Sequence, residues 1–196
     1  MYVRFVKPAV DLVLALVATA LLAPFALGVA LTILAVEGGP VLFSQTRIGK
    51  RGRPFPIYKF RTMLPGSEDE HGVTARGDTR ITRLGAFLRR WKLDELPQLY
   101  NVLRGQMSLV GPRPEVPGYA DTLSGEDRLI LEIRPGITGP ATLTYRNEEE
   151  ILAAQPDPVR YNDEVIFPDK FRINLCFLRE VSLSKDLGYL LKTVIG

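Results

Sequence analysis

The longest feature of the hydrophobic pattern is an uncharged run near the N-terminus. Residues 12–36 form 25 consecutive positions without a charged side chain. As one straight helix this run would be roughly 37 Å long, which exceeds the roughly 30 Å hydrocarbon core of a bilayer. A cleaved signal peptide fits less well, because its apolar region is shorter and no clean small-residue cleavage site follows the run. The pattern therefore predicts a membrane segment.

A proline at the centre of this run predicts a bent helix. Pro24, preceded by Ala23, has twelve uncharged residues on either side, and a mid-helix proline removes one backbone bond and kinks the helix. Basic residues flank both ends of the run, and such flanks prefer the cytoplasm. A spanning helix with a simple kink would place one basic flank outside, whereas a re-entrant helix keeps both inside. Both topologies remain open, and we favour re-entry.

The rest of the chain predicts shorter elements. Residues 40–49 and 55–63 read as two strands joined by the turn GKRGRP. Helical spacing follows in 81–91 and in 93–105, where Gly105 is the expected C-terminal stop. Further expectations are a loop over 64–79 that is a candidate lid, irregular proline- and glycine-rich stretches at 108–117 and 133–141, and short helices from Glu148 onwards, with apolar stripes in 171–181 and 185–196.

Composition narrows the class of partner and the kinds of site. The net charge of +3 and the pI of about 9.1 suit an anionic nucleotide, phosphate or lipid headgroup, and are too weak to argue for nucleic acid. One cysteine, Cys176, excludes an internal disulfide and a multi-cysteine zinc site. One histidine, His71, argues against a histidine-based metal site. Any metal should therefore be held by carboxylates, which points to magnesium, manganese or calcium.

An adjacent pair of acids, Asp94 and Glu95, opens the second predicted helix. Acids in a first turn commonly do no more than favour the positive end of the helix dipole. Here a basic stretch precedes the pair and Pro97 fixes the turn. Neighbours on a helix point about 100° apart, so one carboxylate could attack while the other holds a cation. The pair is a candidate for both catalysis and metal binding.

Several basic and polar side chains are candidates for binding phosphate. Arg113 lies between two prolines in GPRP, and a rigid guanidinium suits bidentate phosphate binding. Lys59 and Arg61 alternate with aromatic residues in YKFRT, so in a strand they share one face. A surface turn and a solvated edge strand are the simpler interpretations. Other candidates lie beside tight turns: Arg134, Arg146 and Asn147.

Four motifs in order carry a family resemblance. A kinked hydrophobic helix, KFRTM, LDELPQLYNVLRGQMSLVGPRP and RPGITG together closely resemble the bacterial sugar transferase family, the small monotopic phosphoglycosyl transferases, over nearly the whole chain. The resemblance implies an α+β fold: a mostly helical monotopic membrane protein with an N-terminal kinked re-entrant membrane helix, a small β-hairpin and amphipathic interfacial helices. Residues 1–38 would form the re-entrant helix and residues 39–196 a catalytic domain at the cytoplasmic face of the bacterial inner membrane.

The resemblance also implies the reaction. Such enzymes transfer a sugar 1-phosphate from a UDP-sugar to undecaprenyl phosphate and release UMP, as the first membrane step of glycan assembly. The nucleophile of their ping-pong route corresponds to Asp94, and Glu95 corresponds to the partner that helps to position Mg²⁺. The phosphate site corresponds to Lys59, Arg61 and Arg113. No nucleic acid is expected as a partner, and the donor sugar and oligomeric state stay open.

Two departures and two rival functions accompany this interpretation. The family kink is commonly Ser-Pro, whereas this chain has Ala23-Pro24, so no hydroxyl supports the bend. After RPGITG many relatives continue WAQV, whereas this chain continues PATLTYRNEEEILA, which indicates a subgroup with a different donor. A membrane-tethered DNA-binding module is disfavoured, because the second helix opens with two acids. A non-catalytic scaffold would be expected to lose the acid pair or Arg113, and both are present.

Overall fold

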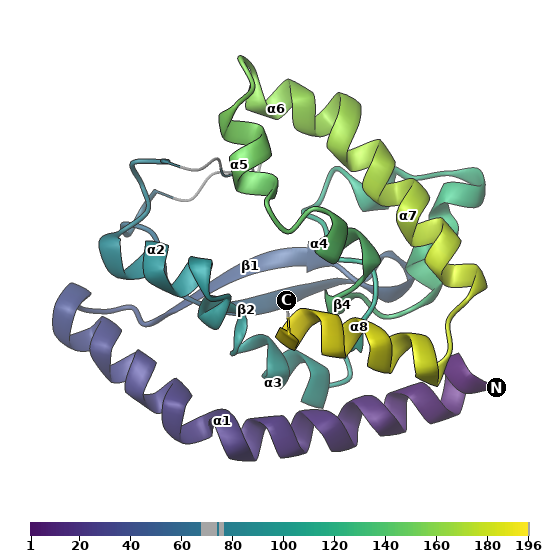
Figure 1. The fold of residues 1–196 in the computed structure, drawn as a ribbon, viewed down its shortest axis with the longest axis horizontal. Coiled ribbons are helices and arrows are strands. Elements are labelled where there is room, and N and C mark those ends of the chain that lie inside the picture. The colour runs from purple at the N-terminus through teal and green to yellow at the C-terminus, as the bar shows by residue number, and fades with distance from the viewer. Residues whose placement is uncertain (68–73, 75–76, 196) are drawn as a thin grey trace.

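The computed structural model describes residues 1–67, 74 and 77–195, and its ribbon is mostly helical with a small two-stranded antiparallel sheet (Figure 1). The helices are α1 (Lys7–Glu37), α2 (Arg83–Arg90), α3 (Gln98–Leu103), α4 (Pro140–Thr144), α5 (Glu148–Ala153), α6 (Pro158–Tyr161), α7 (Phe167–Arg179) and α8 (Leu183–Ile195). The strands are β1 (Leu42–Ile48), β2 (Pro54–Phe60), β3 (Ser108–Val110) and β4 (Gly136–Thr138).

The predicted apolar segment is one long helix. α1 continues through Pro24 and changes direction part-way along its length (Figure 1). Within the described part of the chain, Tyr2–Glu37 is the helical stretch long and apolar enough to cross a membrane, with a mean hydropathy of 2.5 and 6% of its most apolar window buried. Both ends of α1 nevertheless pack on the remaining structure, through Lys7, Asp11 and Ala15 at one end and Ile33 at the other.

The predicted hairpin is confirmed. β1 and β2 pair antiparallel, with Phe43 opposite Lys59 and Arg47 opposite Phe55. Alternate residues of β1 are covered, which puts Phe43, Gln45 and Arg47 on the inner face. The turn between the strands is a short 3-10 segment, Lys50–Gly52. Because residues directly opposite each other share a face of the sheet, Lys59 lies on the inner face with Arg47.

The stretches predicted as irregular contain a second pair of strands, so that prediction was wrong. β3 and β4 run parallel, with Ser108 opposite Gly136 and Val110 opposite Thr138. Glycines allow the two backbones to approach: a Cβ on Gly136 would lie 2.1 Å from the nitrogen of Gly111. These strands are three residues long and rich in glycine nearby, so they lack the alternating pattern that identifies a strand in the sequence.

The segment 93–105 is also not the single helix that was expected. Leu93–Glu95 forms a separate 3-10 turn that follows Lys92 in a left-handed conformation (φ 55°). Pro97 is then the N-cap of α3, and the predicted stop at Gly105 is confirmed by its φ of 70°. Pro97 lacks the N–H that would continue a helix from the preceding turn, which separates the acid pair from α3.

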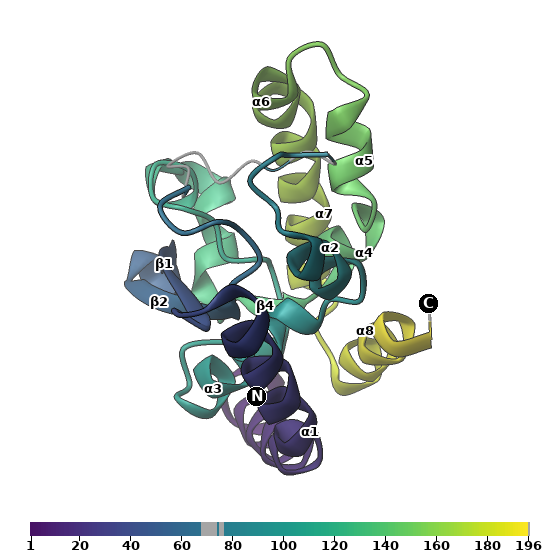
Figure 2. The same cartoon turned by 90° about the vertical axis from the view of Figure 1, so that its left-hand side faces the viewer.

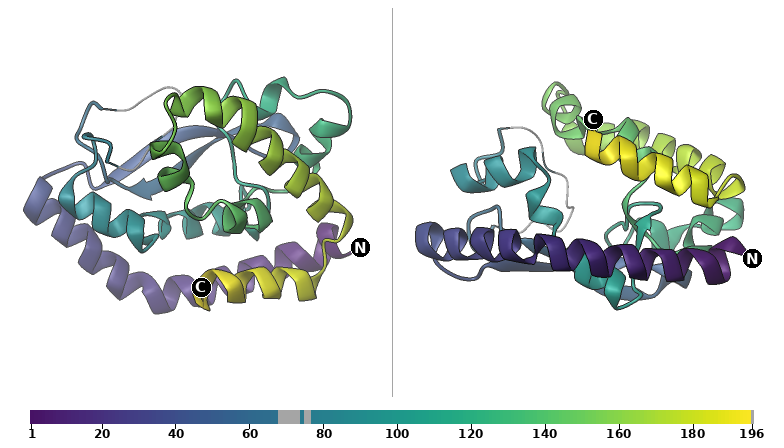
Figure 3. Two further views of the ribbon diagram at one scale, coloured as in Figure 1. Left: turned by 45° about the horizontal axis from the view of Figure 1, so that its top comes forward. Right: turned by 60° about the horizontal axis from the view of Figure 1, so that its bottom comes forward.

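The C-terminal helices form an arch over the hairpin. Figure 2 shows α5, α6 and α7 stacked together, with α8 set apart from them, and Figure 3 shows that α8 starts near the N-terminal end of α1, where Lys7 bonds Asp186. The predicted stripe of α7 is confirmed, because Phe171, Leu175 and Leu178 join one core cluster. α8 leaves apolar side chains exposed, among them Leu191 and Val194. Half of the candidate lid over 64–79 consists of residues 68–73 and 75–76, which lie outside the described residues.

Candidate active site

The acid pair is held in a buried turn between the hairpin and two helices. Leu93–Glu95 packs against β2 and α2. Asn101 of α3 secures the hairpin, since its side chain accepts from the backbone N–H of Tyr58 (3.2 Å) and donates to the carbonyl of Pro56 (2.7 Å). Asp94 is 5% exposed and Glu95 is 8% exposed. Burial of two adjacent carboxylates requires compensating cations, because burying an unpaired charge is costly.

Two of the predicted basic residues supply that compensation. Glu95 Oε1 accepts from Lys59 Nζ at 3.1 Å and from Arg113 Nη2 at 2.6 Å. Burial alone would raise the pKa of Glu95, but Arg113 and then Lys59 outweigh burial and hold the pKa below its usual value. Glu95 in turn raises the pKa of Arg113, whereas burial lowers the pKa of Lys59. Glu95 is therefore ionised, and both cations are fixed beside it.

Asp94 has a different environment from its neighbour. Burial raises the pKa of Asp94, Lys59 opposes that rise, and the charge on Glu95 adds to it. Its Oδ1 is buried and has no hydrogen-bond partner among the described residues. A buried carboxylate oxygen without a partner is costly and commonly marks a place for a ligand, a water or an ion. Glu95 is therefore neutralised by cations, whereas Asp94 keeps an oxygen that is available for chemistry.

The other predicted residues lie in different places. Arg61 follows the end of β2 and donates from Nη2 to the carbonyls of Glu37 (3.1 Å) and Gly38 (3.0 Å), at the end of α1. Arg134 is partly buried, with its guanidinium against Gly105. Arg146 is exposed and donates to the carbonyl of Lys192 in α8 (2.9 Å). Asn147, also exposed, is the N-cap residue of α5.

One residue that the sequence reasoning did not select belongs to this site, and a second is buried close to the acid pair in the chain. Arg47, on the same hairpin face as Lys59, lies close enough to Arg113 and Glu95 to interact electrostatically, and burial lowers its pKa to about 10. Gln98, four residues after Asp94, is 1% exposed, and its Nε2 has no partner among the described residues. Alternation along the two strands of the predicted hairpin is the signal that could have found Arg47.

The site fits a divalent cation that completes its coordination with substrate. Asp94 and Glu95 offer carboxylate oxygens, the ligand type that Mg²⁺ prefers. Over the described ranges there is no cluster of three or more histidine, cysteine, aspartate or glutamate residues that could hold a metal alone. Mg²⁺ is commonly bound through one or two carboxylates together with substrate phosphates. The free Oδ1 of Asp94 is consistent with such an arrangement.

A carboxylate pair beside two fixed cations, next to a long apolar helix, defines a site suited to acting on phosphate groups near a membrane. Comparison with known sequences gives the family. The chain belongs to the bacterial sugar transferase family, whose sequence model matches residues 2–196. The resemblance seen in the motifs is thereby confirmed.

Several relatives carry names that describe related reactions. The UDP-glucose:undecaprenyl-phosphate glucose-1-phosphate transferase of Caulobacter vibrioides is 41% identical over 194 residues, which are 96% of this chain and 68% of the relative. The UDP-N-acetylgalactosamine-undecaprenyl-phosphate N-acetylgalactosaminephosphotransferase of Aeromonas hydrophila is 37% identical over 97% of this chain and 43% of its own length. The UDP-glucose:undecaprenyl-phosphate glucose-1-phosphate transferase of Escherichia coli is 40% identical over 169 residues, which are 83% of this chain and 36% of the relative. The chain thus spans less than half of two of these three relatives.

Proposed function

We propose that this protein transfers a sugar 1-phosphate from a UDP-sugar to undecaprenyl phosphate, giving undecaprenyl-diphosphate-sugar and UMP. The observation that carries the proposal is that the two acids of the pair have different partners. Glu95 is neutralised by Lys59 and Arg113, while Asp94 keeps a buried oxygen without a partner. The names of the relatives support the substrate classes.

The proposed reaction has two steps. In the first, an oxygen of Asp94 attacks the β-phosphorus of the UDP-sugar, and the bond to the bridging oxygen breaks so that UMP leaves. This gives an acyl phosphate in which the sugar phosphate is attached to Asp94. In the second, an oxygen of undecaprenyl phosphate attacks the same phosphorus and expels the carboxylate. The sequence is ping-pong, and Asp94 must be ionised at its start.

Fixed positive charge supports both steps. Lys59 and Arg113, already aligned on Glu95, would stabilise the charge that develops on the transferring phosphoryl group without further reorganisation. Asp94 and Glu95 would hold Mg²⁺, which neutralises diphosphate oxygens when it is bound. We propose that Arg134, Arg146 and Asn147 act on the nucleotide or sugar side of the donor. Arg61, which bonds the end of α1, acts on the site from a greater distance.

We further propose that α1 enters the cytoplasmic face of the inner membrane and leaves on the same side. The supporting observation is that both ends of α1 contact the same body. Lys7 pairs with Asp186 of α8 (2.6 Å) at one end, and Ile33 is fully buried in a cluster with Phe60 and Leu88 at the other. A straight spanning helix would carry one of these ends to the far side of the bilayer, away from its partner. Residues 1–38 would then be the membrane unit, and 39–196 the catalytic domain.

The test is release of UMP from a panel of UDP-sugars, with undecaprenyl phosphate and Mg²⁺ present. We expect one donor to give UMP with the wild type and with Asp127→Asn, a matched change at an exposed acid. We expect Asp94→Asn to release none while remaining folded and bound to vesicles. Near-normal turnover by Asp94→Asn would refute the assignment of the nucleophile. The absence of UMP with every common UDP-sugar, from folded wild type, would refute the reaction.

A further inference from the structure

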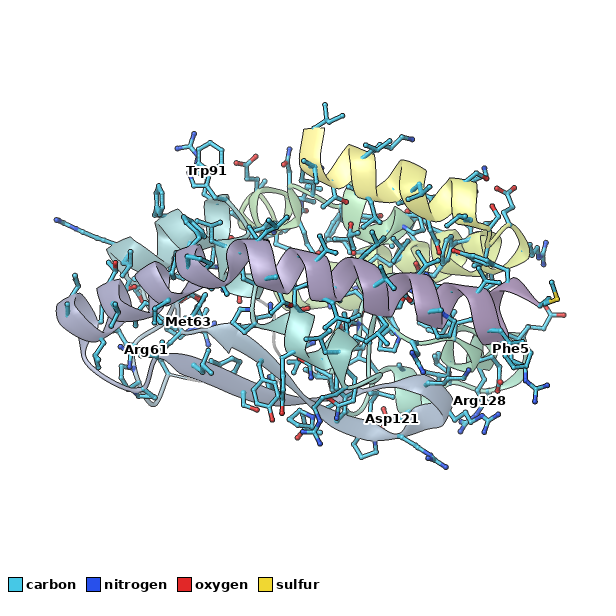
Figure 4. The ribbon with its side chains drawn as sticks, turned by 90° about the horizontal axis from the view of Figure 1, so that it is seen from below. Phe5, Arg61, Met63, Trp91, Asp121 and Arg128 are labelled. Carbon is cyan, nitrogen blue, oxygen red and sulfur yellow. The ribbon has the colours of Figure 1, made fainter. Side chains whose placement is uncertain are left out.

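The membrane helix is fastened to the rest of the protein by a buried polar contact near each end. Near its N-terminal end, Asp11 Oδ2 accepts from Ser108 Oγ (2.7 Å) and Oδ1 accepts from the backbone N–H of Leu109 (3.2 Å). At its C-terminal end, the carbonyls of Glu37 and Gly38 accept from Arg61. Asp11 is 6% exposed and Arg61 is 5% exposed. Figure 4 shows Arg61 beside one end of α1 and Phe5 near the opposite end.

Each contact lies close in the chain to one of the two cations that hold Glu95. Arg61 is two residues after Lys59, and its own N–H bonds the carbonyl of Val41, which continues the hairpin pairing by one step (2.9 Å). Leu109 is four residues before Arg113. The two ends of one helix are therefore bonded to the two segments that place Lys59 and Arg113.

The connection from Leu109 to Arg113 is stiff. β3 is completely buried, and the bonds continue past its end, with Gly111 donating to Thr138 (2.9 Å) and Gly136 donating to the carbonyl of Pro112 (2.8 Å). A Cβ on Gly139 would lie 2.3 Å from the carbonyl oxygen of Gly111, so the two backbones are in direct contact at this point. Movement of β3 would be passed on to Arg113, because close-packed backbones transmit displacement.

Between the two contacts, α1 is mostly exposed and contains Pro24. Asp11 and Glu37 are 26 positions apart, roughly 39 Å along a straight helix at about 1.5 Å per residue. A bend at Pro24 shortens that separation. The depth and thickness of the surrounding bilayer act on the bend, because helices respond to hydrophobic mismatch by tilting or kinking.

We propose that Asp11 and Arg61 are positioning residues that couple the bend of α1 to the placement of Arg113 and Lys59 around Glu95. Turnover then depends on bilayer thickness through these two contacts, beyond any effect on membrane binding. The inference rests on the proposed transferase reaction for its kinetic readout. It differs from anchoring alone, because it makes the membrane helix part of the apparatus that aligns the phosphate-binding cations.

The kinetic test uses the full-length protein in vesicles of dimyristoleoyl or dieicosenoyl phosphatidylcholine. The variants are Asp11→Ala, Asp11→Asn, Arg61→Gln and, as a control on the same helix, Thr32→Val, which removes a hydroxyl that donates to the carbonyl of Gly28 in the preceding turn. We expect turnover of the wild type and the control to differ between the two bilayers by about threefold or more. Asp11→Ala and Arg61→Gln should lose that difference and turn over about 10- to 100-fold more slowly, with donor KM little changed.

Asp11→Asn should recover part of the turnover, because its side-chain oxygen can still accept from Leu109. A merely structural role would not produce this pattern, since reduced folding lowers the active fraction equally in both bilayers. A bilayer response in Asp11→Ala equal to that of the wild type would overturn the proposal. If Asp11→Ala does not fold, Arg61→Gln and Arg61→Lys test the same coupling from the other end.

Amide hydrogen exchange supplies a readout that does not need turnover. In the wild type, exchange of residues 108–113 should change with bilayer thickness, and in Asp11→Ala it should be fast in both bilayers. Wild-type protein that releases no UMP yet shows this exchange pattern would refute the proposed reaction and leave the coupling intact. Exchange that is insensitive to the bilayer in the wild type would overturn the coupling whether or not UMP is released.

Discussion

Replacing Arg113 with methionine would remove the shorter of the two ion pairs on Glu95. The Arg113 Nη2 atom lies 2.6 Å from Glu95 Oε1, and the Glu95 side chain is 10% exposed. Breaking a fully buried ion pair costs about 3–5 kcal/mol of folding free energy, because the remaining charge is left uncompensated. Here the Arg113 side chain is 31% exposed and Lys59 still contacts the same oxygen at 3.1 Å.

We therefore expect Arg113→Met to lower the free energy of unfolding by about 2 kcal/mol, below the fully buried range because of that exposure and the remaining cation. For a chain of this size, that corresponds to a fall in Tm of roughly 4–8 °C. Glu95→Gln should also destabilise, because it leaves Lys59 and Arg113 close together without the carboxylate that both contact. The loss of unfolding free energy in the double variant Arg113→Met/Glu95→Gln should be smaller than the sum of the losses in the two single variants, by about 1 kcal/mol or more.

The pH dependence of the effect follows from the direction of the Glu95 pKa shift. The folded pKa of Glu95 is held below the reference value of 4.5, because Arg113 and Lys59 outweigh burial. A depressed pKa contributes stability that is fully present above the unfolded value and is lost as the pH falls through the folded value. The difference between wild type and Arg113→Met should thus be full at pH 7 and shrink in strongly acidic solution.

The measurement is thermal unfolding of the four proteins of this cycle, followed by circular dichroism in one detergent over a pH series. Arg104→Met, at an exposed arginine that follows α3, is the matched control and should change Tm little. Strict additivity of the Arg113 and Glu95 effects at pH 7 would refute the reasoning. An Arg113→Met deficit that grows as the pH falls would contradict the assigned direction of the pKa shift.

Three further changes have defined outcomes. Burial raises the pKa of Asp94 above 3.8, so its ionised form costs folding free energy at neutral pH. Asp94→Asn should therefore raise Tm at pH 7, and this gain in Tm should disappear in acid, where Asp94 is protonated in both states. A lower Tm of the variant at pH 7 would contradict this. Gly85→Ala should destabilise by more than about 2 kcal/mol, since its Cβ would lie 2.0 Å from the Thr62 carbonyl oxygen, whereas Gly188→Ala, with open space around it, should not. Phe5 is 63% exposed. In a variant that lacks Cys176, the substitution Phe5→Cys should not react with a membrane-impermeant thiol reagent added outside cells. Labelling at this position would refute re-entry.

Strong periodicity explains the parts of the fold that could be predicted. The uncharged run, the strand alternation on both sides of GKRGRP and the apolar spacing of α2 and α7 each repeat over many residues. β3 and β4 could not be identified in this way, because each has three residues and their pairing depends on glycines that are far apart in the chain. The 3-10 turn was missed because the proline was interpreted as part of the first turn of α3, whereas it is the N-cap.

The candidate site was predictable in its residue types more than in its geometry. Lys59 and Glu95 are 36 positions apart, and nothing local shows that Lys59 reaches Glu95 while Arg61 turns to the end of α1. Lys59 and Arg61 are two positions apart in one segment, but β2 ends at Phe60, so Arg61 lies beyond the strand and its side chain takes a different direction. Asp11 was not selected because it borders the uncharged run, where an acid reads as the limit of the membrane segment.

The buried pair Lys7–Asp186 joins residues that are 179 positions apart, and the hydrogen bond between Asp11 and Ser108 joins residues that are 97 positions apart. During synthesis at roughly 5–20 residues per second, α1 emerges before its polar partners, and Asp11 is without Ser108 for roughly 5–20 seconds until β3 is made. The partner of Lys7 is made later still. A nascent chain must therefore hold Lys7 and Asp11 in water or at a membrane surface, so early capture of α1 by lipid would protect the apolar helix from aggregation until α8 closes the N-terminal contact.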